Sequence, residues 1–196
     1  MSEVAICNQA LSWLGANLII SLNDPGDEAR LCKANYDLAR RATLESAAWT
    51  FATKRATLAQ LAGAPVWGYG VRYQLPADNL RVLSVSDDGH RDTSQEWVVE
   101  SGTLLCDLQK IYIRYIWNVV DTAKFSPMYV QALAARIAAD IAIPLTHDRV
   151  LQKDMWGLYD AKISDGATVD NLQGRRQRTR STRLIGVRNR AGGVGL

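Results

Sequence analysis

Cysteine and histidine are scarce in this chain, which has three cysteines and two histidines among its 196 residues. Cys7, Cys32 and Cys106 lie far apart and form no Cys-x-x-Cys pair, which indicates buried free thiols in a reducing cytoplasm. A structural zinc site needs four ligands, and His90 and His147 are too isolated to complete one with these cysteines. We therefore expect no metal and no other cofactor.

Long apolar runs are missing as well. Because the sequence has no run of about 18 apolar residues, it predicts no membrane span. The segment Met1–Cys7 lacks the basic flank and apolar stretch of a signal peptide. With 47% hydrophobic residues and six tryptophans, the composition is that of a globular chain, and its length fits one domain with a tail.

Motifs that carry catalytic chemistry are also absent. The chain has no G-x-x-x-x-G-K-[ST] phosphate loop, no G-x-S-x-G elbow and no H-E-x-x-H helix. Gly68-Tyr69-Gly70 precedes no helix and indicates a turn, and His147-Asp148 fits a helix cap better than a catalytic dyad. A carboxylate pair for glycoside hydrolysis has no fixed spacing, so that alternative stays open. We expect a protein that is not an enzyme.

Acidic residues are absent from the C-terminal segment. Asn171–Leu196 contains seven arginines and no Asp or Glu, whereas Met1–Asp170 holds the other 16 Lys and Arg against all 20 Asp and Glu. With so few apolar residues, this segment cannot offset its own ordering entropy. We therefore expect residues 167–196 to form a flexible arm that binds an acidic partner. The arginines predicted to make that contact are Arg175, Arg176, Arg178, Arg180, Arg183, Arg188 and Arg190.

Apolar spacing predicts four helices in a body of residues 1–166. The first carries Leu18 at the end of its apolar side, and the second carries Leu31, Leu38, Ala42 and Trp49 on its own apolar side. Asp24-Pro25-Gly26 supplies a cap and a proline to start the second helix. The helices are expected at residues 3–16, 26–48, 127–145 and 148–165.

The last two helices have recognisable limits. Ser126-Pro127 starts the third helix, and Pro144 ends or kinks it. The fourth is capped by Thr146 or Asp148 and is expected to end near Gly166. Six alanines allow a neighbouring helix to approach the third one closely: Ala132, Ala134, Ala135, Ala138, Ala139 and Ala142.

Between Trp49 and Trp117 the apolar period changes from helical to two. Strands are expected at Leu80–Val85, Glu96–Val99 and Ile111–Trp117, and Gly-containing turns separate them. Residues 49–117 are therefore predicted to form a small antiparallel sheet or meander inserted into the helical bundle. The resulting fold class is α+β and mainly helical.

Two segments of the insertion carry motifs. Ala48–Leu58 has the pattern W-x-F-A-x-x-R-x-x-L, and Tyr73–Val82 has the pattern Y-x-L-P-x-D-x-L-R-V. In these motifs and their order, the chain resembles tail tubular protein A of short-tailed bacteriophages over about residues 3 to 165. We expect the aromatic residues to fill the core and the proline-containing stretch to fix a strand entry. The motif residues are Trp49, Phe51, Tyr73, Leu75, Pro76 and Asp78.

The resemblance implies a structural virion protein at the head–tail junction, made in the host cytoplasm. Such adaptors, or gatekeepers, form rings, commonly of twelve copies, between the portal protein and the tail nozzle protein. They continue the channel for duplex DNA during ejection, and tail fibres attach near this junction in related phages. The resemblance also implies a mainly helical body with a β insertion, whose loops at residues 63–70 and 87–92 face neighbours or the nozzle.

The partner of the arginine arm has two candidate classes. Arginine binds carboxylate and phosphate equally well through forked hydrogen bonds. A protein partner, either the portal or an adjacent copy, is favoured because tight phosphate contacts would retard DNA passing through a channel. The alternative is a nucleic-acid-binding module with steep salt dependence, although no aromatic residue stands among the arginines to stack on bases. A tail-associated peptidoglycan hydrolase is the third and weakest interpretation.

Overall fold

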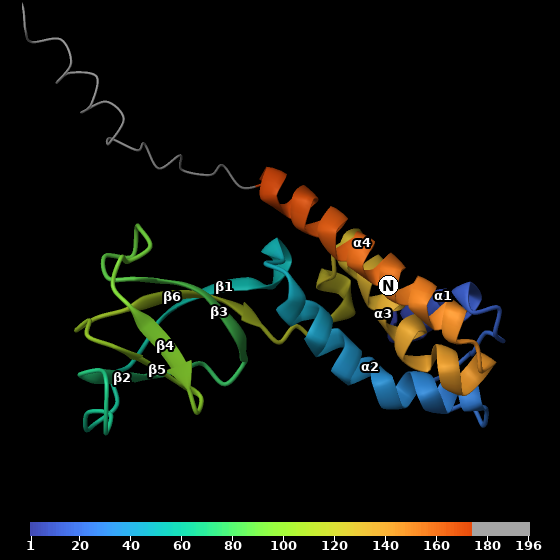
Figure 1. The fold of residues 1–196 in the computed structure, drawn as a ribbon, viewed down its shortest axis with the longest axis horizontal. Coiled ribbons are helices and arrows are strands. Elements are labelled where there is room, and N and C mark those ends of the chain that lie inside the picture. The colour runs from blue at the N-terminus through green and yellow to red at the C-terminus, as the bar shows by residue number, and fades with distance from the viewer. Residues whose placement is uncertain (174–196) are drawn as a thin grey trace, which may run out of the picture.

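The computed structural model describes residues 1–173, which form a helical half and a β half placed end to end along the long axis (Figure 1). The predicted α+β class is confirmed. Over the described residues the helices are α1 (Glu3–Trp13), α2 (Asp27–Ser46), α3 (Pro127–Thr146) and α4 (Arg149–Gln173). The strands of the same range are β1 (Thr53–Thr57), β2 (Val71–Gln74), β3 (Asn79–Ser86), β4 (Trp97–Glu100), β5 (Thr103–Cys106) and β6 (Tyr112–Trp117).

Helix α3 is the central helix of the helical half and packs against α1, α2 and α4. It begins as predicted, with Pro127 in the first turn and the Ser126 hydroxyl accepting a hydrogen bond from the backbone N–H of Tyr129 at 3.3 Å. All six alanines of its stripe are fully buried. Since a methyl side chain lets helix backbones approach closely, the stripe serves packing within the chain.

Pro144 lies inside α3 and does not end it. The helix ends at Thr146, and His147 follows in the left-handed conformation with φ of 55°. Asp148 then caps α4, because its Oδ1 accepts hydrogen bonds from the N–H groups of Val150 at 2.8 Å and Leu151 at 3.1 Å. This confirms the cap interpretation of the His147-Asp148 pair.

Helix α4 is longer than predicted, since it continues past Gly166 to Gln173. Gly166 does not end the helix. It packs against the Trp49 ring, where an added Cβ would lie 2.7 Å from ring carbons. A glycine inside a helix lets another group approach the helix backbone, and here that group is a buried indole. The first residues of the predicted arm, 167–173, are therefore helical.

The limits of the first two helices also differ from the prediction. Helix α1 ends at Trp13 because Gly15, at a φ of 68°, turns the chain away, so Leu18 lies outside the helix and is exposed. Helix α2 starts at Asp27 with Gly26 as its cap residue. Asp24 instead accepts hydrogen bonds from the preceding N–H groups of Ile20 and Ser21.

The apolar side predicted for α2 is correct only in part, since Trp49 is fully buried and Leu31 packs against the core. Leu38 is exposed and Leu31 is only partly buried. The face that packs into the helical half carries smaller or polar residues, and it includes a nearly buried arginine. Its members are Ala29, Cys32, Tyr36, Ala39, Arg40, Thr43 and Leu44.

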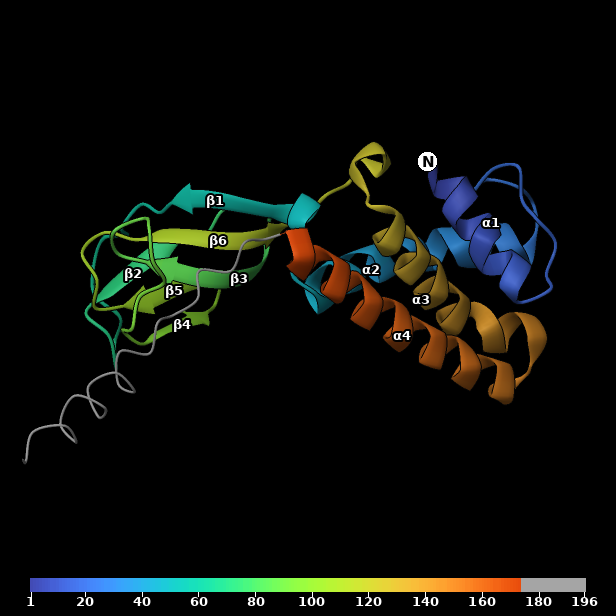
Figure 2. The ribbon, with the colours of Figure 1, turned by 90° about the horizontal axis from the view of Figure 1, so that it is seen from above.

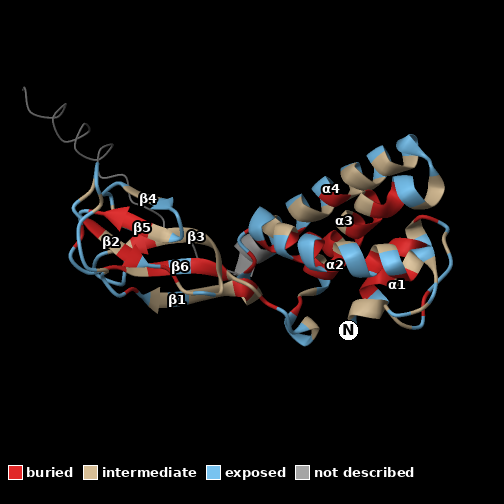
Figure 3. Ribbon diagram, turned by 90° about the horizontal axis from the view of Figure 1, so that it is seen from below, coloured by how far each residue is buried: buried red, intermediate tan, exposed pale blue. Residues whose placement is uncertain are grey.

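The β half contains two three-stranded antiparallel sheets where the sequence predicted one. One sheet has the order β1-β6-β3 and the other the order β2-β5-β4. Buried side chains of both sheets form one core, which includes Tyr73, Val85, Leu104 and Ile113. Figure 3 shows the buried residues of each half gathered inside it, with exposed residues on the outer faces.

The Tyr73–Val82 segment is not one strand. Strand β2 ends at Gln74, and β3 starts at Asn79 in the other sheet. Between them, the N–H of Asn79 donates to the Pro76 carbonyl at 2.9 Å, so the chain turns here from one sheet to the other. The proline-containing stretch does fix a strand entry, that of β3. Strands β1, β2 and β5 had no separate prediction.

Candidate partner-binding surfaces

The first motif segment begins in the core of the helical half and continues into β1. Trp49 is fully buried, and its Nε1–H donates to the Thr43 carbonyl at 2.8 Å. Its ring meets that of Tyr129 edge to face at 5.2 Å between centroids. Phe51 is partly buried and meets the same tyrosine edge to face, at 5.1 Å between ring centroids. These aromatic residues hold the end of α2 against α3, so they have a structural role.

The second motif segment begins in the core of the β half. Tyr73 is buried, and its hydroxyl donates to the Leu108 carbonyl at 2.7 Å. Leu75 is buried beside it in the same core, and Pro76 is partly buried. Burial raises the pKa of the Tyr73 hydroxyl, which therefore stays a proton donor.

Asp78 joins the two motif segments. Its carboxylate accepts a hydrogen bond from Lys54 Nζ at 2.7 Å and one from the Tyr115 hydroxyl at 3.0 Å. Burial by itself raises the pKa of Asp78, but the hydrogen bonds from Lys54 and Tyr115 outweigh it, and the net pKa is lowered. The Lys54 ammonium also lies 3.6 Å from the centre of the Trp117 ring. Two motifs some 24 positions apart in sequence thus meet where the two halves join.

A buried arginine ties α2 to the chain that leaves β6. The Arg40 side chain is only 3% exposed, and it donates to Asn118 Oδ1 at 2.6 Å and to the Val119 carbonyl. Asp37 pairs with Arg40 and with Arg41, the latter at 2.9 Å. The hydrogen bond from Arg40 is the main cause that lowers the pKa of Asp37. Arg40 was not predicted as a buried residue, because spacing alone does not separate a buried arginine from its exposed neighbour.

An exposed apolar loop lies at the free end of the β half. We call residues 63–70 the tip loop. The backbone on either side of it is paired, with Leu61 N–H donating to the Arg72 carbonyl at 2.9 Å. Its large apolar side chains Trp67 and Val66 are exposed, at 89% and 107% relative exposure. This loop was expected to face neighbours or the nozzle, and the exposed indole fits a contact of either kind.

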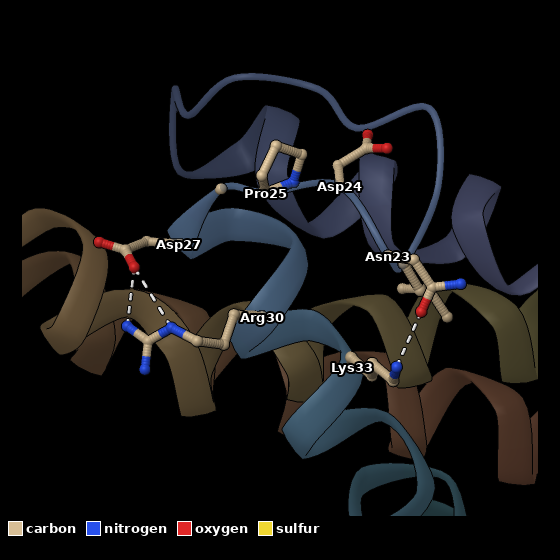
Figure 4. A pocket seen from close by; sticks show the side chains of 8 residues that line it. Asn23, Asp24, Pro25, Asp27, Arg30 and Lys33 are labelled. Atoms are coloured by element: carbon tan, nitrogen blue, oxygen red, sulfur yellow. Dashed lines mark hydrogen bonds and ion pairs between the residues drawn. The ribbon is translucent and has the colours of Figure 1, made fainter.

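An open pocket lies at the opposite end, in the helical half (Figure 4). We call it the helix-end pocket. It has a volume of about 450 Å³ and is formed by the connection between α1 and α2 and by the first turns of α2. Two cations reach it, although Arg30 is paired with Asp27 at 2.7 Å and Lys33 donates to Asn23 at 2.8 Å. Its lining residues are Leu22, Asn23, Asp24, Pro25, Gly26, Asp27, Arg30 and Lys33.

The histidines and cysteines build no site in the described part of the chain. Residues 1–173 hold no group of three or more His, Cys, Asp or Glu side chains that could bind a metal ion. All three cysteines are buried free thiols, as predicted. A hydrogen bond with Cys32, together with burial, raises the pKa of Cys7. Asp88 accepts hydrogen bonds from the backbone N–H groups of Arg91 and His90, which lower its pKa to about 2 and order the turn.

The seven arginines predicted to bind a partner, from Arg175 to Arg190, lie outside the described residues. The last described turn of α4 ends close to the joint between the two halves (Figure 2). Within residues 1–173, α3 alone is long and apolar enough to cross a membrane by length and composition. That is weak evidence for a span, because 61% of its most apolar window is buried inside the protein. Comparison with protein-family models and with curated proteins found no match.

Proposed function

We propose that this protein is a structural subunit of the adaptor ring between the portal and the tail nozzle of a short-tailed bacteriophage. The observation that carries the proposal is the joint between the two halves. The motif segments that resemble tail tubular protein A converge there, through the 2.7 Å contact between Lys54 and Asp78. Lys54 stands at a variable position of the first pattern, so the support comes from the two segments lying side by side and not from a contact between two motif residues.

The joint also supports the mechanical role of a channel wall. A buried arginine of α2 donates to Asn118 and to Val119 in the chain that leaves β6, which ties the two halves together. Since breaking this tie would leave buried donors unpaired, it restrains motion between the halves. A subunit that stays stiff along its length suits a ring that passes duplex DNA under pressure.

The arm supplies the contact with the portal in this proposal. Helix α4 packs along α3 and ends near the joint, so the seven arginines follow directly from a fixed point of the body. An acidic groove on the portal or on an adjacent copy would pair with their guanidinium groups. The nozzle protein would then lie on the far side of the ring, with fibres near the junction.

Electron microscopy of the chain mixed with its portal protein tests the proposal. We expect a closed ring on the portal, with extra density extending from the C-terminal end of α4. A chain that stops after Gln173 keeps the whole of α4 and is expected to fold but not to dock. The matched control replaces all seven arginines by lysine and keeps the charge. Normal docking by the shortened chain would refute the role of the arm.

Nucleic-acid binding is the second candidate, because the segment after Asp170 has a charge of +7. This candidate predicts that the protein binds duplex DNA at moderate salt. The logarithm of the binding constant should fall with the logarithm of the salt concentration, with a slope of about −0.9 for each phosphate contact. Replacing Arg175, Arg176, Arg178 and Arg180 by alanine should then abolish retention. Loss of DNA binding without loss of portal docking would favour this candidate.

A further inference from the structure

Two sheet edges of the β half carry backbone groups that have no partner in the described part of the chain. Strand β2 is an edge strand but is covered, because the N–H of Leu61 donates to its Arg72 carbonyl at 2.9 Å. Strand β3 is interrupted by two register shifts, and the N–H of Thr93 donates to its Val85 carbonyl at 2.8 Å. Strands β1 and β4 pair on one side only within residues 1–173. An uncovered edge of this kind is a template for pairing with another chain.

The turn after β4 decides which backbone groups of that strand face outward. Ser101 and Gly102 both have positive φ, of 47° and 74°, as in a two-residue hairpin turn of type I′. The residues that flank such a turn bond to each other, and bonded and unbonded residues then alternate along the strand. The N–H and C=O groups of Trp97 and Val99 therefore point away from β5, and no backbone hydrogen bond of the described residues reaches them.

Strand β1 offers a matching edge. The N–H of Leu58 donates to the Ile111 carbonyl at 3.2 Å, so the same alternation turns the N–H and C=O groups of Arg55 and Thr57 away from β6. Neither residue has another backbone partner among those that the structure describes. Each of the two edges thus offers at least two outward residues, two positions apart, and each can complete the hydrogen bonds of the other.

The side chains beside the two edges have opposite charges. Ala56 of β1 and Trp97 of β4 pack against the core of the β half, so residues an odd number of positions away point to the outer face of each sheet. On β1 these include the exposed cation Arg55, and on β4 they include the exposed carboxylates Glu96 and Glu100. None of these three charges forms an ion pair within the described residues. Joining the two edges would bring them onto one face, where opposite charges on adjacent strands attract.

We propose that the β4 edge of one copy pairs with the β1 edge of a second copy, so that a sheet continues from one copy into the next. Figure 2 shows β1 and β4 on opposite sides of the β half, beside the long axis and not at its ends. The contact joins one surface of a copy to a different surface of the next, which forms a ring when the rotation between copies closes. The inference rests on the proposed adaptor function, in which copies standing side by side form the wall of the channel.

A second copy is favoured over the arginine arm as the occupant of the β4 edge. The arm could pair with the two carboxylates there, but it would leave the β1 edge open, and its cations would be repelled by Arg55. A second copy satisfies both edges at once, with opposite charges at each contact. The full-length chain with Arg175, Arg176, Arg178 and Arg180 replaced by alanine should therefore associate as wild type does. Loss of association in this variant would make the arm the occupant and overturn the proposal.

Sedimentation velocity on the full-length chain, with two proline variants, tests the contact. Val99→Pro and Thr57→Pro each remove one outward N–H, at edge positions where proline breaks no hydrogen bond of the strand's own sheet. We expect wild type to associate as its concentration rises. Each proline variant should weaken association by about 10-fold or more, because a carbonyl of the incoming strand loses its donor. Val99→Thr and Thr57→Val are the matched controls, which keep the N–H and should associate as wild type does, and circular dichroism checks that all four variants fold.

Hydrogen exchange of the wild-type chain gives a readout that needs no variant. The backbone N–H groups of Trp97, Val99, Arg55 and Thr57 should exchange rapidly in the dilute monomer and slowly in the associated protein. The tip loop, residues 63–70, lies outside both edges and should exchange equally in the two states. Association that leaves the four edge groups unprotected overturns the proposal. A wild-type chain that remains monomeric up to about 1 mM, the limit of a weak interface, also overturns it.

Mixing the two proline variants shows whether unlike edges pair. The Val99→Pro copy keeps its β1 edge and the Thr57→Pro copy keeps its β4 edge, so one intact contact can form between them. We expect the mixture to form dimers that grow no further. A mixture that stays monomeric overturns the proposal. Loss of association in only one of the two variants would indicate a contact between like edges, which overturns it as well.

The outcome is separable from that of the adaptor function. If the portal still assembles a ring of Val99→Pro copies, the proposed contact is wrong and the adaptor function stands. If copies associate through the β1 and β4 edges but never bind the portal, the contact stands and the adaptor function is wrong.

Discussion

Gly166→Ala should destabilise the protein even though alanine is the better helix former. An alanine Cβ at this position would lie 2.7 Å from Trp49 Cη2 and 2.7 Å from Cζ3, well inside van der Waals contact. The indole has little freedom to withdraw, because it is fully buried, bound to the Thr43 carbonyl and packed edge to face against Tyr129. One methyl group therefore forces either the ring or α4 to shift.

The same helix contains a control. Gly157 lies in α4, and a Cβ added there would have no neighbouring atom within 4 Å, so Gly157→Ala adds a methyl group without a clash. It should raise the free energy of unfolding by about 1 kcal/mol, the difference in helix propensity. Gly166→Ala gains the same term but incurs about 1–3 kcal/mol of overpacking strain. We therefore expect Gly166→Ala to be less stable than Gly157→Ala by about 1–3 kcal/mol.

Urea unfolding followed by circular dichroism measures the difference, and thermal unfolding should show it as about 2–4 °C per kcal/mol. Trp49→Phe tests the cause, because it removes the two ring carbons that Gly166→Ala would meet. In that background, Gly166→Ala should stabilise as Gly157→Ala does, which gives a non-additive double-mutant cycle. Equal stability of the two alanine variants in the wild-type background would refute the packing role of Gly166.

Further predictions concern the joint, the β half and the thiols. Arg40→Ala should lower the free energy of unfolding by about 1.5–3 kcal/mol, the contribution of hydrogen bonds to a charged group. Because Arg41 is half exposed, Arg41→Ala should change that free energy by less than about 0.5 kcal/mol. Urea unfolding compares the two variants, and equal effects would contradict the role of Arg40. Tyr73→Phe leaves a buried carbonyl unpaired and should cost about 1–3 kcal/mol in the same assay. The folded-state pKa of Asp78 is below its unfolded value of about 3.9, so the stabilisation it provides is present above that pH and is lost as the pH falls through the folded value. Asp78→Asn should therefore reduce the pH dependence of the unfolding free energy between about pH 5 and 2. The reduction should be less than about 1 kcal/mol, because the pair with Lys54 is partly exposed. The three thiols should react with a thiol reagent only in urea, since each is buried, and rapid reaction of the native protein would contradict their burial.

The sequence determined the elements that local chemistry specifies. Ser126-Pro127 began α3, Asp148 capped α4, and Gly15 ended α1, because caps, prolines and glycines act on the few residues beside them. The alanine stripe of α3 also predicted close helix packing correctly. The α+β class followed from the change of apolar period at Trp49.

The packing partners came only from the tertiary structure. The side of α2 that is buried carries Arg40 and small residues, whereas exposed Leu38 misled the apolar pattern. Strand β6 alternates as predicted as far as Tyr115, but Ile116 is buried as well, because there the strand enters the helical core. The apolar period of a strand predicts its buried face only where a single neighbouring layer covers that strand.

Whether a residue serves structure or a partner was likewise decided by contacts between distant segments. Gly166 was predicted to end a helix, but in the structure it lies inside α4 and packs against the ring of Trp49, which is more than a hundred positions earlier in the sequence. Local sequence determined where helices begin and where turns fall. The tertiary structure alone decided three other features: the joint at Asp78, the exposure of Trp67 and the pocket beside Ile20. Each depends on which surfaces the folded chain brings together, and no short stretch of sequence contains that information.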